Sequence, residues 1–227
     1  MRRARSVAEQ TERVRRLQDR EAHRYDRRIA FVERVLVEGG REWVCGRARG
    51  RVLEVAVGTA RNVRYYPAEV ILTGVELSEQ MLAIGRRRAR ELGRDADLRL
   101  GDAQALDFDD GAFDTVVCTL ALCTVPDPRR AVAEARRVLR PGGRILLLEH
   151  VRSPLLAVRL VQHLLEPLSL HLAADHLTRE PLDDLAAEGF EIETVERSKW
   201  GLVERVSARK PDAMREPRRR IPSGGRH

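Results

Sequence analysis

Acidic residues and a glycine stand where two apolar, strand-like stretches of the chain end. The first stretch, residues 51–57, contains Glu54 and is followed by Gly58; the next closes on Glu76, 22 positions after Glu54. Gly58 permits a tight turn and lets a ligand approach the backbone closely. The spacing of the two acids suits a carboxylate that accepts both ribose hydroxyls of an adenosine. A nucleotide-containing cofactor is therefore our first hypothesis.

The turn after the first stretch does not fit a dinucleotide. A dinucleotide fingerprint requires three glycines, because pyrophosphate needs close backbone approach at a helix N-terminus. The corresponding positions hold Ala56, Gly58 and Arg61. An acid beside this loop, Glu54, would repel phosphate and suits a cofactor with a cationic end instead.

The elements that must position these residues follow an alternating pattern. Apolar runs predict strands at residues 51–57, 70–77, 97–100, 113–120 and 144–149. Several of them are near-continuous Val/Leu/Ile runs, as expected of parallel strands buried on both faces. Helical segments separate them, with Ser78 as the cap of a helix over 79–91 and a second helix over 128–139 that stops at Pro141. In such a sheet, ligands bind outside the carboxyl ends of the strands.

The last two apolar runs, 191–198 and 203–208, are separated by only four residues. A connection that short makes a hairpin, so one of these strands must run antiparallel to the rest. We therefore predict an α/β fold: a doubly wound, mostly parallel seven-stranded sheet with an antiparallel C-terminal strand.

The net charge of +7 over 227 residues is located at the ends of the chain. Residues 1–28 and 209–227 each carry +5, which leaves −3 for the body. We expect a basic N-terminal helical or flexible segment over 1–28, a main domain over 29–210 and a disordered basic tail over 211–227. Basic ends of this kind are either solvated or make a weak contact with phosphate or an anionic membrane surface. The mildly acidic body argues against a nucleic-acid partner.

Three cysteines, an odd number, together with an N-terminus that lacks an apolar leader pattern, favour reduced thiols. We therefore expect a cytoplasmic location, with peripheral membrane contact through the basic ends left open. Cys118 is expected to be an inert core thiol, whereas Cys123 can approach the site.

Five motifs in order resemble those of class I S-adenosylmethionine-dependent methyltransferases. They are 52–59 (VLEVAVGT), 74–76 (GVE), 101–103 (GDA), 113–120 (FDTVVCTL) and 139–143 (LRPGG). The resemblance runs from about Tyr25 to Pro211 and implies a Rossmann-like methyltransferase fold.

Within that superfamily, the chain is similar to small ubiquinone/menaquinone-type methyltransferases and to phospholipid and thiol methyltransferases. The segments that resemble the thiol group in particular are 62–67 (NVRYYP), 118–123 (CTLALC), 149–151 (EHV) and 177–180 (LTRE). One departure is that Ala56 and Ala60 stand where the family usually has glycine.

The resemblance implies a site for S-adenosyl-L-methionine built from residues that follow the first four strands. Glu54, Gly58 and the backbone from Ala56 through Thr59 to Ala60 would hold the methionyl end, and Glu76 would hold the ribose. The adenine would contact Leu77, Met81, Asp102 and the Ala103 amide. Thr119 and Leu120 would line the path near the sulfonium, and Tyr25 would close over the cofactor.

Methyl transfer from a sulfonium needs mainly orientation and a dry site. A general base is needed only for a hydroxyl, an ammonium or an acidic carbon, and His150 and His176 are the candidates. For each of them the sequence favours a solvated or core-edge histidine over a base, because nothing places it beside a substrate. The spacing of His171, Asp175 and His176 suggests a metal site, but no cysteine or cluster of acidic ligands accompanies them in the sequence. We therefore expect no metal.

Residues 154–176 read as a helical insertion that is strongly apolar. It is either a core-packing helix pair or a lid or interfacial helix over a lipid-like acceptor.

The resemblance implies a methyltransferase for a small or lipid-like acceptor such as a quinol, phenol, thiol or amine. The alternative is a non-catalytic, methyltransferase-like regulator with weak cofactor binding, which Ala56 and Ala60 motivate. A nucleic-acid methyltransferase is disfavoured by the acidic body.

Overall fold

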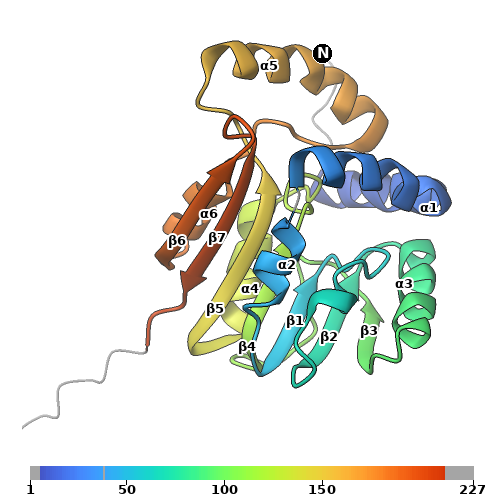
Figure 1. Cartoon of the computed structure of the whole chain (residues 1–227), viewed down its shortest axis with the longest axis vertical. Coiled ribbons are helices and arrows are strands. Elements are labelled where there is room, and N and C mark those ends of the chain that lie inside the picture. Colours follow the sequence, from blue (N-terminus) through green and yellow to red (C-terminus); the bar gives the residue numbers. More distant parts are fainter. Residues whose placement is uncertain (1–5, 38, 213–227) are drawn as a thin grey trace, which may run out of the picture.

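The computed structural model describes residues 6–37 and 39–212. Within these residues one seven-stranded sheet has the order β3-β2-β1-β4-β5-β7-β6 (Figure 1). The strands are β1 (Arg51–Val55), β2 (Ile71–Glu76), β3 (Ala96–Leu100), β4 (Phe113–Thr119), β5 (Leu139–His150), β6 (Glu191–Ser198) and β7 (Val203–Arg209). β7 runs antiparallel to both of its neighbours, and the remaining pairs are parallel. The predicted fold class and the closing hairpin are confirmed.

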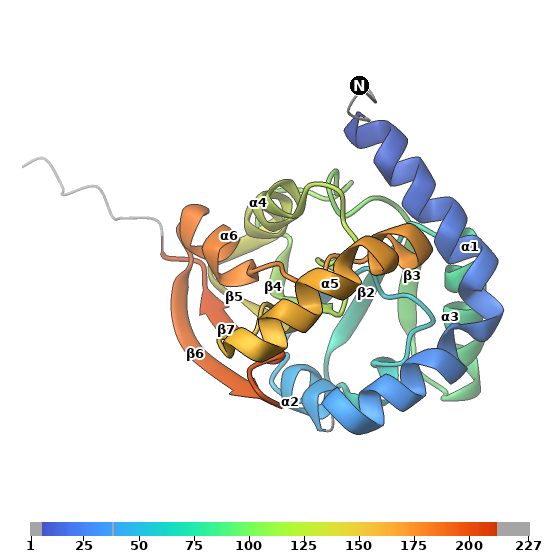
Figure 2. The ribbon, with the colours of Figure 1, turned by 90° about the horizontal axis from the view of Figure 1, so that it is seen from above.

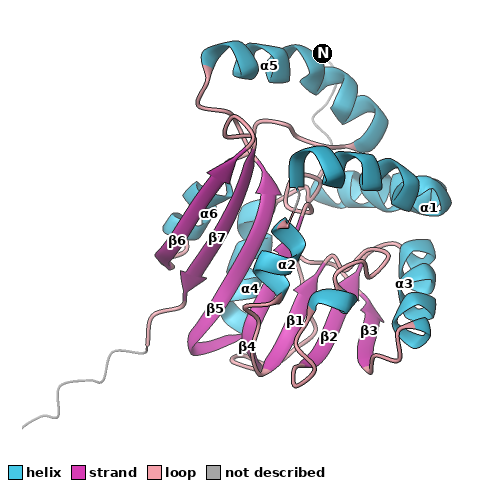
Figure 3. Ribbon diagram, in the orientation of Figure 1, coloured by secondary structure: helices cyan, strands magenta, loops and turns pink. Residues whose placement is uncertain are grey.

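Helices cover both faces of the sheet (Figure 3). The α-helices are α1 (Val7–Val32), α2 (Gly40–Cys45), α3 (Glu79–Glu91), α4 (Pro128–Val138), α5 (Leu156–Ala173) and α6 (Pro181–Ala187), with a π-turn at Glu33–Val37 and a 3₁₀ turn at Val63–Tyr65. Among the described residues, none of these helices has the length and apolar character required to cross a bilayer.

Alternating side chains of the central strands fill two apolar cores. Leu147 packs on one face with residues of α4 and α6, and its neighbour Leu146 packs on the other face with residues of α2 and α3. Each buried leucine contributes about 2 kcal/mol relative to an exposed one. The near-continuous apolar runs of the sequence are explained by this burial on both faces.

The bounds of α3 and β5 can be compared with the bounds predicted from the sequence. Helix α3 spans Glu79–Glu91 as predicted, and the Ser78 hydroxyl accepts from the Met81 amide at 3.1 Å. β5 was expected from residue 144 but begins at Leu139, so this boundary was wrong. Gly142 adopts φ +75°, the register shifts opposite β4, and the Gly142 amide donates to the Lys210 carbonyl at 3.0 Å. Pairing with the end of the chain therefore holds the glycine turn within the sheet.

α1 curves around the carboxyl ends of the strands on the β3 and α3 side, as the view from above shows (Figure 2). A capping box between Ser6 and Glu9 begins the helix. Asp19 accepts from the Ser78 hydroxyl at 2.6 Å, and Asp26 accepts from the Thr59 hydroxyl at 2.7 Å. The helix runs without a break across the boundary expected between residues 28 and 29. The C-terminal tail from 213 onward lies outside the described residues.

Candidate functional site

A pocket lies at the carboxyl ends of β1, β2 and β3, beneath α1. Predicted site residues among its lining are Ala56, Glu76, Leu77, Asp102 and Ala103. The other lining residues come from α1 (Val14 and Gln18), from β2 and the turn after β3 (Val75, Gly101 and Gln104), and from the loop after β4 (Thr124, Val125 and Pro126). The Gln18 side-chain oxygen is buried without a hydrogen-bond partner. The pocket thus has an unsatisfied acceptor on its α1 side.

Glu76 ends β2 and joins the loop after β1 to the start of α3. Its two carboxylate oxygens accept from the amides of Gly58 and Ser78, both at 2.8 Å. Burial raises the pKa of Glu76, and the backbone amides partly oppose that rise. A carboxylate has about four acceptor positions, so this one retains capacity for hydroxyl donors in the pocket.

Asp102 follows β3 and is held by the side chain of Gln104. The Gln104 amide nitrogen lies 3.0 and 3.1 Å from the two Asp102 oxygens and 3.1 Å from the Thr11 hydroxyl of α1. The Gln104 oxygen accepts from the Asp127 amide at 2.9 Å. Gln104 therefore connects the acid to α1 and to the cap of α4. The sequence analysis missed it because a glutamine two residues past an acid carries no distinctive signal.

The loop after β1 contains three residues with left-handed backbone: Ala56 (φ +53°), Gly58 (φ +57°) and Ala60 (φ +57°). Open space surrounds the position where a Cβ on Gly58 would lie. A ligand can therefore pass close to the backbone at Gly58, as a bound methionyl group requires. Ala56 lines the pocket, whereas the Ala60 methyl is buried in the core on the α2 and α3 face. Thr59 is engaged by Asp26.

Glu54 lies in a buried polar network next to this loop. Its carboxylate accepts from the Asn62 amide at 2.8 Å and from the Tyr66 hydroxyl at 2.9 Å. Burial raises its pKa to about 7, although Tyr66 and Arg41 oppose the rise. Arg41 donates to Asn62 at 2.7 Å and to the Thr119 hydroxyl at 3.1 Å. Glu54 and Thr119 are not among the residues that line the pocket, so the structure places them in a supporting network beside it.

The sequence analysis assigned no role to Arg41, Asn62 or Tyr66 in this network. Asn62 and Tyr66 belong to the segment over 62–67 that carries the family resemblance. That segment could have indicated them, whereas Arg41 stands in a part of the chain without a motif.

Three further predicted residues lie around the pocket, outside its lining. Tyr25 packs in a small apolar cluster with Ala22, Met81 and Ile84 between α1 and α3. Burial raises the pKa of Tyr25 to about 12, so its hydroxyl stays protonated. Leu120 has φ +52°, and its amide donates to the Leu148 carbonyl at 2.8 Å.

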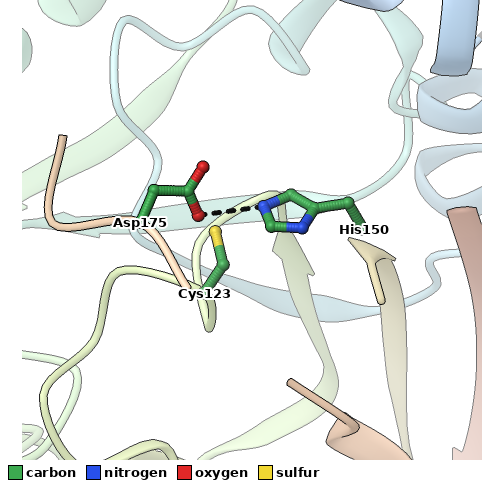
Figure 4. Close-up of side chains that lie close together, drawn as sticks. All are labelled: Cys123, His150 and Asp175. Atoms are coloured by element: carbon green, nitrogen blue, oxygen red, sulfur yellow. Dashed lines mark hydrogen bonds and ion pairs between the residues drawn. The ribbon is translucent and has the colours of Figure 1, made fainter. Parts of the chain in front are cut away.

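Cys123, His150 and Asp175 meet beyond the ends of β4 and β5 (Figure 4). The His150 Nε2 atom lies 3.0 Å from the Asp175 Oδ1 atom. Burial lowers the pKa of His150, but the hydrogen bond and charge of Asp175 outweigh it and raise the pKa. Asp175 has a lowered pKa because His150 outweighs the effect of burial. The arrangement is therefore an imidazole oriented by an ionised carboxylate.

The same three residues each offer one donor atom of a metal-ligating type, all within 4.8 Å of one another. Burial raises the pKa of the Cys123 thiol well above its usual range, which favours the protonated thiol over the thiolate ligand. The structure pairs Asp175 with His150 rather than with His171, the partner considered from spacing.

The other histidine candidate, His176, has its Nδ1 atom 3.6 Å from a Glu166 oxygen. Burial and Arg179 lower its pKa. His150 is thus the candidate that a carboxylate orients at hydrogen-bond distance.

Glu149 fixes the loop that carries Cys123. One oxygen accepts from the amides of Ala121 and Leu122 at 2.9 and 3.0 Å, and the other is buried without a partner. Burial raises the pKa of this carboxyl. The ends of β4 and β5 are therefore held together by one acid next to His150.

A family model described as a methyltransferase domain matches residues 53–147. Human thiol S-methyltransferase TMT1B is 34% identical over 164 residues, which cover 67% of both chains. Phosphatidylethanolamine N-methyltransferase of Cereibacter sphaeroides is 43% identical over 114 residues, which cover 48% of this chain and 56% of the relative. Ubiquinone/menaquinone biosynthesis C-methyltransferase of Dinoroseobacter shibae is 39% identical over 130 residues, which cover 54% and 51%. The chain thus spans about half the length of the latter two.

Solved structures show the same fold. An S-adenosylmethionine-dependent methyltransferase from Thermotoga maritima matches with a TM-score of 0.68 and 24% identity over 86% of this chain and 99% of that chain. Geranyl diphosphate C-methyltransferase from Streptomyces coelicolor, solved with S-adenosyl-L-homocysteine, matches with a TM-score of 0.62 and 19% identity over 76% and 80%. With the pocket at the strand ends and these relatives, the chain belongs to the class I S-adenosylmethionine-dependent methyltransferase family, in the group of ubiquinone/menaquinone, phospholipid and thiol methyltransferases.

Proposed function

We propose that the protein transfers a methyl group from S-adenosyl-L-methionine to a small or lipid-like acceptor. The observation that carries this proposal is the pocket in which Glu76 and Asp102 line the carboxyl ends of adjacent strands. Two acids at neighbouring strand ends suit the ribose and the amino group of an adenosine.

The residues present fit this donor, which when bound supplies an electrophilic sulfonium methyl group. Glu76 would accept from the ribose hydroxyls, and Asp102 would accept from the adenine amino group. The open space above Gly58 admits the methionyl chain. Glu54 would support the site indirectly, because its carboxylate holds Asn62 and Tyr66 beside the loop after β1.

His150 would remove the proton of a protic acceptor. Because Asp175 is ionised and lies next to Nε2, that nitrogen carries the hydrogen and Nδ1 keeps a free lone pair. The acceptor proton moves to Nδ1 as the acceptor atom gains its new bond to carbon. Asp175 then stabilises the imidazolium that forms.

The names of the relatives support the acceptor classes proposed: a quinone-type carbon, a phospholipid amine and a thiol. All three acceptors, or their conjugate acids, lose a proton when they are methylated. His150 would act as the base that accepts this proton.

The test is calorimetric titration of S-adenosylmethionine and S-adenosylhomocysteine into the wild type and a Glu76→Ala variant. Glu69→Ala, an exposed acid outside the pocket lining, is the matched control. We expect the pocket substitution to weaken binding about 100-fold, since it removes a charge-assisted pair of hydrogen bonds. The control should bind as the wild type does.

Circular dichroism of each variant, and a second variant, Asp102→Asn, separate a binding defect from a folding defect. Absence of binding by the folded wild type at millimolar ligand would overturn the proposal and favour the regulator alternative. Binding without methylation of any quinol, phenol, thiol or aminolipid would also favour that alternative.

A further inference from the structure

Helix α5 exposes a row of large apolar side chains on the outside of the molecule. We call this surface the outer leucine face; it consists of Leu156, Leu160, Val161, Leu164, Leu165, Leu168 and Leu172. Leu164 is 79% exposed, and the other members are between 48% and 61% exposed. They recur every three or four residues, with two adjacent pairs at 160–161 and 164–165, which places them on one side of the helix. Soluble monomers rarely expose so continuous an apolar patch unless it binds something.

Two polar side chains of α5, Gln162 and Glu166, face inward while its leucines face outward, which differs from the usual arrangement of a surface helix. Within α5, all of which is described, Gln162 is the buried side chain. Its amide donates to the carbonyls of Val151 and Leu177 at 2.9 and 2.8 Å and accepts from the Ser153 amide at 2.8 Å. The Thr178 hydroxyl donates to Glu166 at 2.7 Å. Polar contacts therefore hold α5 with its leucines outward, and the core-packing helix pair considered from sequence is wrong.

The β6–β7 turn next to the outer leucine face carries side chains that are typical of a membrane interface. Trp200 is 70% exposed in the β6–β7 turn, beside Lys199, and the Ser153 hydroxyl donates to the Trp200 carbonyl at 2.7 Å. This bond fixes the tryptophan turn at the start of α5. Tryptophan and lysine next to an apolar helix face are typical of the boundary between lipid headgroups and acyl chains.

The other neighbour of α5 supplies positive charge. Arg13 of α1 donates to the carbonyls of Leu170 and His171 at 2.8 and 3.1 Å, which joins the two helices (Figures 1 and 2). α1 exposes five further arginines: Arg16, Arg20, Arg24, Arg27 and Arg28. Arg16 and Arg28 form ion pairs with Glu12 and Glu21 of the same helix. A cationic helix face attracts anionic headgroups in proportion to its charge.

We infer that α5 docks this protein on an anionic phospholipid membrane, with the outer leucine face in the headgroup–acyl boundary and the α1 arginines toward the lipid phosphates. Helix α5 lies over the carboxyl ends of the strands (Figure 2). On the proposed function, a lipid-like acceptor could then reach the site from the membrane. The docking itself does not depend on that function.

The test is flotation of the full chain with vesicles of equal parts phosphatidylcholine and phosphatidylglycerol, without methyl donor. A Leu160→Ser/Leu164→Ser variant removes two outward side chains. The matched control is Ile71→Ser/Ile192→Ser, which changes two exposed residues at the opposite end of the sheet. We expect the α5 variant to lose about tenfold or more in vesicle binding, while the control binds as the wild type does. Pure phosphatidylcholine vesicles should bind the wild type more weakly.

Two outcomes would overturn the inference. Undiminished binding by the α5 variant would place the contact in the basic ends of the chain, which this variant retains. The second outcome is a wild type that does not bind vesicles and sediments as a dimer, together with an α5 variant that sediments as a monomer. It would show that the outer leucine face contacts a second copy of the chain. Circular dichroism of the variant guards against misfolding. Donor binding, measured separately, remains informative in either case.

Discussion

At the scale of single residues, the two alanines of the loop after β1 have different surroundings. Both hold a left-handed backbone, which costs a residue with a Cβ about 1 kcal/mol more than it costs glycine. Ala56→Gly should therefore raise the free energy of unfolding by about 1 kcal/mol. Ala60→Gly should change it little, because losing a buried methyl offsets about 0.8 kcal/mol of the same gain. Urea unfolding of both variants measures the difference; an equal effect at the two sites would exclude this explanation.

The pairing of His150 with Asp175 can also be tested one residue at a time. Asp175 raises the pKa of His150 against the opposing effects of burial and Arg179; Glu149 adds to the rise, and Cys123 completes the cluster. Asp175→Asn should thus lower the pKa of His150, and with it the acid limb of the pH–rate profile, since the neutral imidazole is the base. Asp183→Asn, an exposed acid of α6, is the control.

The His150 pKa can be followed by NMR titration of its ring protons, which does not require turnover. An unchanged titration in Asp175→Asn would show that the carboxylate does not set the imidazole pKa. A shifted titration with an unchanged pH–rate profile would show instead that His150 is not the base.

At the scale of elements, strand positions were predictable, but side-chain partnerships were not. The Val/Leu runs indicated β1, β4 and β5 because burial on both faces leaves few polar positions there, whereas the exposed β6 was indicated by the short connection to β7. The spacing of Glu76 and Asp102 put them at the pocket because adjacent parallel strands end side by side. Nothing local in the sequence indicated that Asn62 and Tyr66 satisfy Glu54, or that Asp175 reaches His150 across 25 positions. Such contacts depend on how loops fold over the sheet.

The orientation of α5 shows the same limit. Its composition indicated an apolar helix, but composition does not say which side faces the protein. The structure resolves this through Gln162, whose three hydrogen bonds to the backbone of neighbouring segments require it to point inward. A leucine in its place would leave the Val151 and Leu177 carbonyls and the Ser153 amide without these partners, at about 1–3 kcal/mol for each group that stays buried, which favours this rotation of the helix.

At the scale of the whole molecule, four buried carboxyls among the described residues have raised pKa values, chiefly because of burial: Glu54, Glu76, Glu149 and Glu204. The folded state therefore holds their protons at pH values where the unfolded chain has released them. For Glu54 the window runs from the ordinary value of 4.5 to about 7. Over that window the free energy of unfolding falls as pH rises, by about 3 kcal/mol for this group alone.

Glu54→Gln removes this titration and leaves the others in place. The stability of the wild type relative to Glu54→Gln should thus decline between pH 5 and pH 8. Urea unfolding of both proteins across that range measures the difference, in which the contributions of the histidines and of the other acids cancel. A difference that stays constant with pH would show that Glu54 is ionised throughout, with Arg41 offsetting its burial. A decline that vanishes on adding S-adenosylmethionine would instead show that the bound cation stabilises the ionised carboxylates, which links the buried charge of the fold to its ligand.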